Sequence, residues 1–213
     1  MAAVDRDRLR RTFTEAVELG AAMTEVARRN LAAFLQVEVV NAAFEDWPLP
    51  AGPFDVVVAA TAFHWIDPEV RLAKTADALR PGGALATMAT HHVAGGTEAC
   101  FAEVQGCYER FDPSTPPGVR LLAPSEIPPD DEELTGSARF GKPVFRRYER
   151  DLTYSTEEYL DVMRTYSGHR ALPPAARNGL LECIGNLIDK RHGGRITKRY
   201  LTELRVVHAE PTG

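Results

Sequence analysis

The chain has 213 residues, of which 44% are hydrophobic and 26% are charged, as in an ordinary globular protein. Its formal net charge is −5 and its pI is about 5.7, so the overall field does not favour binding to nucleic acid. No run approaches the ~20 apolar residues of a membrane span, and the N-terminus lacks the apolar core of a secretory signal. We therefore expect one α/β domain in the cytoplasm, with no nucleic-acid or membrane partner.

The three cysteines, Cys100, Cys107 and Cys183, are too few and too scattered to predict a disulfide framework or a zinc site. Cys100 and Cys107 are seven residues apart, which places both on one face of a helix. We expect semi-buried thiols in a reducing compartment rather than a redox pair. The side chains of His91 and His92 diverge on a strand, so no metal site is expected.

Hydrophobic spacing in the first 90 residues predicts strands that alternate with helices. The predicted elements are a charged helix over residues 5–12, strands over 13–19 and 37–40, helices over 23–35 and 68–79, and strands over 54–60 and 84–89. The strand over 54–60 is a continuous apolar run, typical of a strand buried on both faces of a parallel sheet. Asp67 is a good N-cap for the helix that begins at Pro68. This order predicts a parallel sheet with crossover helices.

The second part of the chain has a different pattern. The predicted elements are a helix over 95–111, an irregular segment with short helices over 112–143, an amphipathic strand over 144–153, helices over 155–164 and 173–190, and a strand over 196–209. Ser155 precedes Glu157 and Glu158, an acidic first turn of the capping type. We expect a single domain made of a leader (1–12), a cofactor-side half (13–90), a helix with an insertion (91–143), and strands with a helical lid (144–209).

Two stretches of sequence resemble one known family. FDVVVAATAFHWID, followed by ALRPGGALATMAT, resembles the type 11 group of class I S-adenosylmethionine-dependent methyltransferases, close to its trans-aconitate methyltransferase-like branch. AVELGAAMTEVARRNL upstream, and MRTYSGHRAL and KRYLTELRVVHA downstream, also look like that branch, so the resemblance covers residues 13–209. It implies a Rossmann-like, mostly parallel sheet with an antiparallel C-terminal strand and a helical lid.

The resemblance also implies a binding site for S-adenosyl-L-methionine. Glu18 would stand at the end of a strand, where a carboxylate can accept from both ribose hydroxyls of the cofactor. The alternative for Glu18 is an exposed acid at a strand end. The residues expected to bind the cofactor are Glu18, Leu19, Phe44, Thr61, Ala62 and Phe63.

The substrate side is expected to combine a loop and a lid. His64 and Trp65 follow the strand over 54–60, and His64 is the candidate general base or orienting donor. Tyr166, His169 and Arg170 would belong to the lid, where Arg170 could pair with a substrate carboxylate. The alternatives are a structural His64 beside a packed Trp65, and a solvated helix end at the lid. Methyl transfer from a sulfonium depends mostly on orientation, because the leaving thioether is neutral.

The sequence departs from the family at two positions of this site. The family begins with a strand and a glycine-rich loop, but the first glycine here is Gly20. The chain therefore looks N-terminally truncated relative to the family, by roughly 30–40 residues. Ala43 stands where the family usually has an Asp that accepts from the adenine amino group, although the backbone amide and the ring of Phe44 remain.

Two functions are compatible with these features. The first is methyl transfer from S-adenosylmethionine to a small molecule. The second is a truncated, catalytically inactive domain that acts as an interaction module or persists as a remnant. An NAD-type oxidoreductase is disfavoured because it too needs a glycine-rich first turn. Loss of a central strand would leave open sheet edges, which predicts a possible homodimer.

Overall fold

The computed structural model describes residues 13–129 and 132–210, and the helix predicted over residues 5–12 lies outside them. The chain forms two compact units. The first unit comprises Met1–Thr87, Glu132–Val144 and Val206–Gly213, and the second comprises Met88–Asp131 and Phe145–Arg205.

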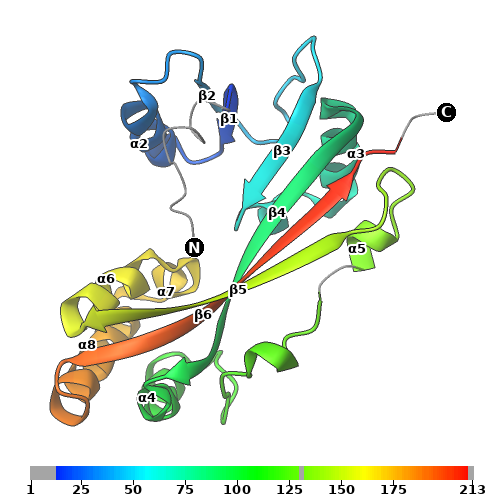
Figure 1. Cartoon of the computed structure of the whole chain (residues 1–213). Helices are drawn as coiled ribbons and strands as arrows, with labels where there is room; N and C mark the ends of the chain where they lie inside the picture. Colours follow the sequence, from blue (N-terminus) through cyan, green and yellow to red (C-terminus); the bar gives the residue numbers. More distant parts are fainter. Residues whose placement is uncertain (1–12, 130–131, 211–213) are drawn as a thin grey trace. The chain divides into compact units, whose positions relative to one another are not determined.

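The first unit contains the predicted alternation of strands and helices (Figure 1). Its elements are β1 (Glu15–Glu18), α2 (Ala21–Leu31), β2 (Glu38–Asn41), β3 (Phe54–Ala60), the 3-10 helix η1 (Phe63–Trp65), α3 (Pro68–Ala78), the start of β4 (Leu79–Gly96) and α5 (Glu132–Thr135). β1 pairs with β2 in parallel, with Glu18 opposite Asn41. The side chain of Asp67 accepts from the Glu69 amide at 2.9 Å, so the predicted N-cap is confirmed.

The second unit is rich in helices that pack against the ends of long strands. Its elements are the end of β4, α4 (Glu98–Phe111), η2 (Pro124–Glu126), most of β5 (Val144–Ser155), α6 (Thr156–Thr165), α7 (Ser167–Ala171), α8 (Pro174–Arg191) and most of β6 (Arg195–His208). The Ser155 amide donates to the Glu158 carboxylate at 2.7 Å, and the Ser155 hydroxyl accepts from the Glu158 amide. The predicted acidic cap of α6 is therefore confirmed as a capping box.

Four strands form one sheet in the order β3-β4-β6-β5, and β1 and β2 form a second sheet. Arg147 on β5 pairs with Glu203 on β6, whereas Asp151 further along β5 pairs with Arg199. Because partner numbers fall along β6 as they rise along β5, β6 is antiparallel to β5. The predicted fold class, a Rossmann-like α/β fold with a mostly parallel sheet and an antiparallel C-terminal strand, is confirmed.

One prediction about β3 is wrong. Its continuous apolar run predicted burial on both faces, yet Val56 is 51% exposed and Val58 is 39% exposed. Val57 and Ala59, on the alternate positions, and Phe54 at the start of the strand pack against the buried core of the first unit. The reason is that, among the described residues, only the face with Val57 and Ala59 packs against a core cluster.

Strand β4 is longer than predicted and takes in the Pro81-Gly82-Gly83 turn. The Gly82 amide donates to the Ala209 carbonyl at 3.0 Å, and the Ala209 amide donates to the Gly83 carbonyl at 2.8 Å. Pairing with the end of β6 therefore draws the turn into the sheet. Gly82 has a φ of 74°, and a Cβ at Gly83 would lie 2.9 Å from the Arg80 carbonyl oxygen, so glycine suits both positions.

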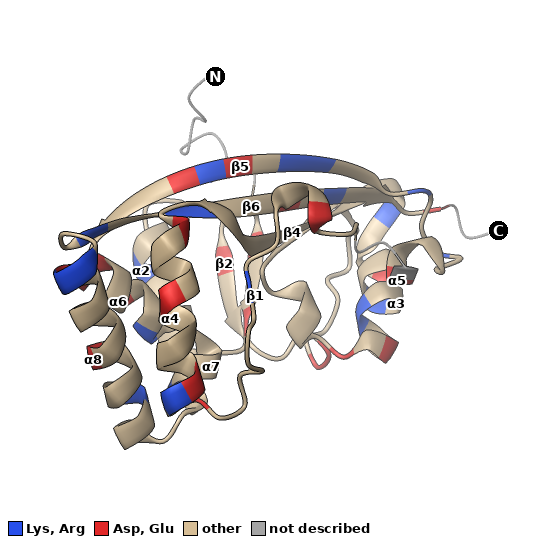
Figure 2. Cartoon of the chain, turned by 90° about the horizontal axis from the view of Figure 1, so that it is seen from below, with Lys and Arg blue, Asp and Glu red and all other residues tan. Residues whose placement is uncertain are grey.

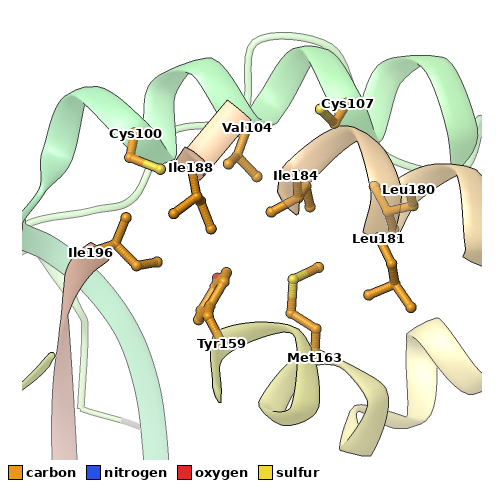
Figure 3. Close-up of a cluster of buried hydrophobic side chains, with 10 residues drawn as sticks. All are labelled: Cys100, Val104, Cys107, Tyr159, Met163, Leu180, Leu181, Ile184, Ile188 and Ile196. Carbon is orange, nitrogen blue, oxygen red and sulfur yellow. The ribbon is translucent and has the colours of Figure 1, made fainter. Parts of the chain in front are cut away.

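The core of the second unit joins α4, α6, α8 and β6. Figure 3 shows its side chains converging from these elements. The cluster consists of Cys100, Val104, Cys107, Tyr159, Met163, Leu180, Leu181, Ile184, Ile188 and Ile196. Cys100 and Cys107 share the buried face of α4, as their spacing predicts.

The expectation of unpaired thiols is wrong for two of the three cysteines. Cys107 of α4 and Cys183 of α8 form a disulfide, whereas Cys100 is free and buried. The bridged residues are 76 apart in sequence, so local spacing gave no signal of their pairing. Their proximity follows from the close packing of α4 against α8 in this core.

The same unit holds a buried lysine, Lys198 of β6, which is 3% exposed. Its Nζ lies 4.0 Å from the centre of the Phe101 ring, a cation–π contact. Burial lowers the pKa of Lys198 to about 8. Keeping the Lys198 amine protonated in this buried position therefore lowers the stability of the folded state.

Removing the disulfide is predicted to destabilise the chain. A covalent link across 76 residues restricts the unfolded chain by about 4 kcal/mol in the chain-entropy model. Cys183→Ala should lower the free energy of unfolding by about that amount in guanidinium titrations and abolish any effect of reductant. Cys100→Ala, the matched control, should keep the sensitivity to reductant. A wild-type chain whose stability is the same with and without reductant would contradict the prediction.

Lys198 should make stability depend on pH. The unfolded chain has an ordinary lysine pKa of 10.5, so between pH 8 and pH 10.5 the unfolded state binds more protons than the folded state. Stability should therefore rise with pH from about 8 upward. Lys198→Met should flatten this slope and add about 2 to 3 kcal/mol at pH 7.

Urea titrations from pH 7 to about 9.5, below the ordinary range of tyrosine, measure this effect. Lys190→Met, which removes an exposed lysine of α8, should leave the slope intact. An unchanged slope in Lys198→Met would show that the pH dependence has another source.

Candidate functional site

The carboxyl end of β1 carries the first predicted cofactor ligand. Glu18 is the last residue of β1, and its Oε1 accepts from the Gly20 amide at 2.7 Å. The Asn41 side chain of β2 donates to the Glu18 and Leu19 carbonyls at 2.8 and 3.0 Å. The side chain of Leu19 is exposed. The parallel pairing of β1 and β2 thus fixes the backbone that presents the Glu18 carboxylate.

The segment after β2 carries Phe44. The Phe44 ring lies 6.0 Å from the ring of Trp47 and 5.6 Å from Nζ of Lys74. The same Nζ donates to the Glu45 carbonyl at 2.7 Å, so α3 holds this segment by a hydrogen bond and a ring contact. The Ala43 carbonyl accepts from the backbone amides of Asp46 and Trp47 and is therefore occupied within its own turn.

The loop after β3 carries the next five predicted residues, Thr61 to Trp65. Thr61 has a φ of 50°, in the left-handed region that non-glycine residues seldom adopt. Phe63 is buried in the core of the first unit, whereas Ala62 and His64 are exposed and Trp65 is 69% exposed. The rings of His64 and Trp65 lie 4.9 Å apart. Phe63 thus anchors the loop, and His64 and Trp65 lie together at its surface.

The predicted lid residues lie in the second unit, where His169 is buried. Its Nδ1 lies 2.8 Å from the Met163 carbonyl and its Nε2 lies 3.0 Å from the Tyr108 hydroxyl. Because a carbonyl can only accept, Nδ1 carries the proton and Nε2 accepts from Tyr108. The Tyr166 ring packs against the His169 ring in a tilted contact with ring centres 5.3 Å apart, and Arg170 is exposed.

Two basic side chains near this lid were missed by the sequence analysis. His92 contacts the rings of Tyr166 and Tyr200 at 5.3 and 5.4 Å. Removal of its ring from water, and then the charge of Lys198, lower the pKa of His92 to about 4. Lys198 stands two residues after buried Ile196, so alternation along the final strand was the signal that could have placed it inward.

The predicted site residues therefore fall into two groups. Glu18, Leu19, Phe44 and the loop from Thr61 to Trp65 belong to the first unit, and Tyr166, His169 and Arg170 belong to the second. A separate open cavity of about 370 Å³ in the second unit is lined by other residues. They are Ala94, Glu98, Phe101, Ala102, Gln105, Gly118, Val119, Arg120 and Leu121.

Among the residues that the structure describes, no group of three His, Cys, Asp or Glu side chains comes together in a way that suits a metal ion. Within the same residues, no helix has both the length and the apolar character needed to cross a membrane.

Comparison with known proteins gives a family match for part of the sequence. Residues 6–83 match the family model described as a methyltransferase domain. Among curated proteins, no sequence is significantly similar to this chain.

Solved structures resemble the whole fold at low sequence identity. A protein of Anaeromyxobacter dehalogenans assigned as a type II methyltransferase is 19% identical, with a TM-score of 0.58 over 93% of this chain and 81% of that one. One of Bacillus halodurans assigned as a methyltransferase is 18% identical, with a TM-score of 0.51 over 93% and 83%. The YcgJ protein of Bacillus subtilis is 15% identical, with a TM-score of 0.51 over 93% and 82%. The chain therefore has the Rossmann-like fold of class I methyltransferases, and its first part matches a methyltransferase domain.

Proposed function

We propose that this chain serves S-adenosylmethionine-dependent methyl transfer to a small molecule, and that its first unit holds the adenosine part of the cofactor. The observation that carries the proposal is the carboxylate of Glu18 at the carboxyl end of parallel strand β1, within the stretch that matches a methyltransferase domain. Open α/β sheets bind ligands outside the carboxyl ends of their strands.

The residues present fit the ribose of the cofactor better than its adenine. Glu18 uses Oε1 to accept from the Gly20 amide, which leaves Oε2 as the acceptor for ribose hydroxyls. Ala43 supplies no side-chain acceptor for adenine, so that contact rests on Phe44. No glycine precedes Gly20 in this sequence. We propose that the chain is related to the trans-aconitate methyltransferase-like branch, and that Glu18 and Phe44 contact the adenosine part of the cofactor.

The substrate is proposed to be a small carboxylate or hydroxyl compound in the cytoplasm. His64 and Trp65 supply an imidazole and an exposed indole at the end of the β3 loop. In the second unit, Arg170 supplies an exposed guanidinium that suits a carboxylate, and the rings of Tyr166 and His169 pack against one another. When bound, the cofactor supplies the methyl group on a sulfonium. The residues of the chain orient the acceptor, and His64 takes its proton where the acceptor is a hydroxyl.

Calorimetry with S-adenosylmethionine tests the cofactor site. The wild-type chain should bind with a micromolar Kd, and Glu18→Gln should weaken binding about tenfold or more, because a hydrogen bond to a charged group is lost. Glu38→Gln is the matched control, since Glu38 is an exposed strand acid on β2. Absence of binding by the wild-type chain would refute the proposal that it is an enzyme and would favour the inactive interaction module.

The open edge of β3 suggests a partner. In the described part of the chain β3 pairs only with β4, and it presents Val56 and Val58 to solvent. By contrast, Figure 2 shows basic and acidic residues following one another along β5, the opposite edge of the sheet. Charge protects an edge strand from pairing with another chain, and β3 has only Asp55. We propose that β3 pairs with β3 of a second copy.

Light scattering coupled to gel filtration tests this pairing. The wild-type chain should elute as a dimer, and Val58→Lys should be monomeric because it places a charge beside the partner strand. Tyr148→Lys makes the same change at an exposed position of β5 and should remain dimeric. A monomeric wild-type chain would refute the pairing.

A further inference from the structure

Arg71 of α3 contacts the loop that carries His64 and Trp65. Its Nε and Nη2 donate to the two carboxylate oxygens of Glu133 in α5, at 2.6 and 2.5 Å. Its Nη1 donates to the carbonyls of Phe63 and Ile66, at 3.2 and 3.4 Å. Its side chain is 16% exposed. One guanidinium therefore contacts the carbonyls on both sides of the two candidate substrate residues.

The geometry requires an arginine. A guanidinium offers five donors in a planar fork, so it can bind a carboxylate through one edge and still donate to carbonyls from another nitrogen. The Arg71 guanidinium carbon also lies 5.2 Å from the centre of the Phe63 ring, which adds a cation–π contact. A lysine at this position would bring a single nitrogen and could not hold all these partners in one arrangement.

A second cation of α3 holds the other segment of the site. Lys74, three residues after Arg71, donates to the Glu45 carbonyl and contacts the Phe44 ring. Residues three apart lie on the same side of a helix. One side of α3 therefore contacts both the Phe44 segment and the Phe63 to Ile66 segment, each through one cation.

We propose that Arg71 is the positioning residue of the methyl-transfer site, and that its guanidinium, held by Glu133, sets the orientation of His64 and Trp65 through the Phe63 and Ile66 carbonyls. The role of Arg71 in methyl transfer rests on the proposed function. Its role in ordering the loop that carries His64 and Trp65 does not, and it can be tested without a cofactor.

The two tryptophans of the chain report separately on the two segments. Trp65 lies in the loop held by Arg71, and Trp47 packs against Phe44, which Lys74 contacts. In fluorine NMR of the chain labelled with 5-fluorotryptophan, Arg71→Lys should shift and broaden the Trp65 resonance and leave Trp47 in place. Lys74→Met, the matched control, should do the reverse. An unmoved Trp65 resonance in Arg71→Lys would overturn the proposal.

A charge-reversed pair separates positioning from simple stabilisation. Arg71→Glu combined with Glu133→Arg restores an ion pair, but it leaves the Phe63 and Ile66 carbonyls without the Arg71 donor. The double variant should therefore recover the thermal stability that Arg71→Glu alone loses, while the Trp65 resonance stays displaced. If Trp65 returned to its wild-type position, the ion pair alone would order the loop, and the positioning role of Arg71 would be refuted.

Cofactor affinity gives the second readout. Arg71→Lys should weaken the Kd for S-adenosylmethionine about tenfold, because the loop that includes the candidate contacts Thr61 to Phe63 is no longer held. If the wild-type chain binds no cofactor, the proposed function fails, while the Trp65 resonance still decides whether Arg71 orders the loop. If cofactor affinity is unchanged in Arg71→Lys while Trp65 moves, the role of Arg71 in the methyl-transfer site is refuted.

Discussion

The structure depends above all on the backbone pairing of the final strand, β6, with β4 and β5. Near one end of β6, the Thr97 amide donates to the Thr197 carbonyl at 2.8 Å, and the Thr197 amide donates to the Thr97 hydroxyl at 2.9 Å. Near its other end, Gly82 and Gly83 exchange hydrogen bonds with Ala209. A Cβ at Gly96 would lie 2.1 Å from the Thr197 carbonyl oxygen, so the close approach requires glycine. Since β6 contributes to both compact units, the last strand of the chain supplies part of the core of each.

The strands that pair through β6 support the two groups of candidate site residues, one in each unit. In the first unit, α3 follows β3 and leads directly into β4. The cations of α3 therefore contact the loops after β2 and β3 from a helix that strands hold at both ends. In the second unit, the α4–α8 core supports Tyr108, which bonds to the buried ring of His169. Rigid elements that present polar groups on short loops are the usual design of a site that orients its ligands. Among the described residues, Glu18 and the β3 loop are the candidates for such a site.

Much of this architecture could be predicted from the sequence, because its signals are local. The period of the apolar residues predicted the order of strands and helices, and cap residues such as Asp67 and Ser155 marked helix starts. The features that were missed are contacts between distant segments. Cys107 meets Cys183 across 76 residues, and Arg71 meets Glu133 across 62. Exposure of one face of β3 was missed for a related reason, since composition cannot show whether a distant element covers that face.

The disulfide has a consequence for the connectivity of the molecule. It closes a covalent ring that runs from Cys107 through η2, α5, β5, α6 and α7 to Cys183. This ring leaves the second unit, passes through the segment Glu132–Val144 of the first, and returns. A protease that cuts the chain once anywhere within the ring therefore opens it without releasing a fragment. Both pieces would still migrate as one molecule in a denaturing gel until a reductant is added.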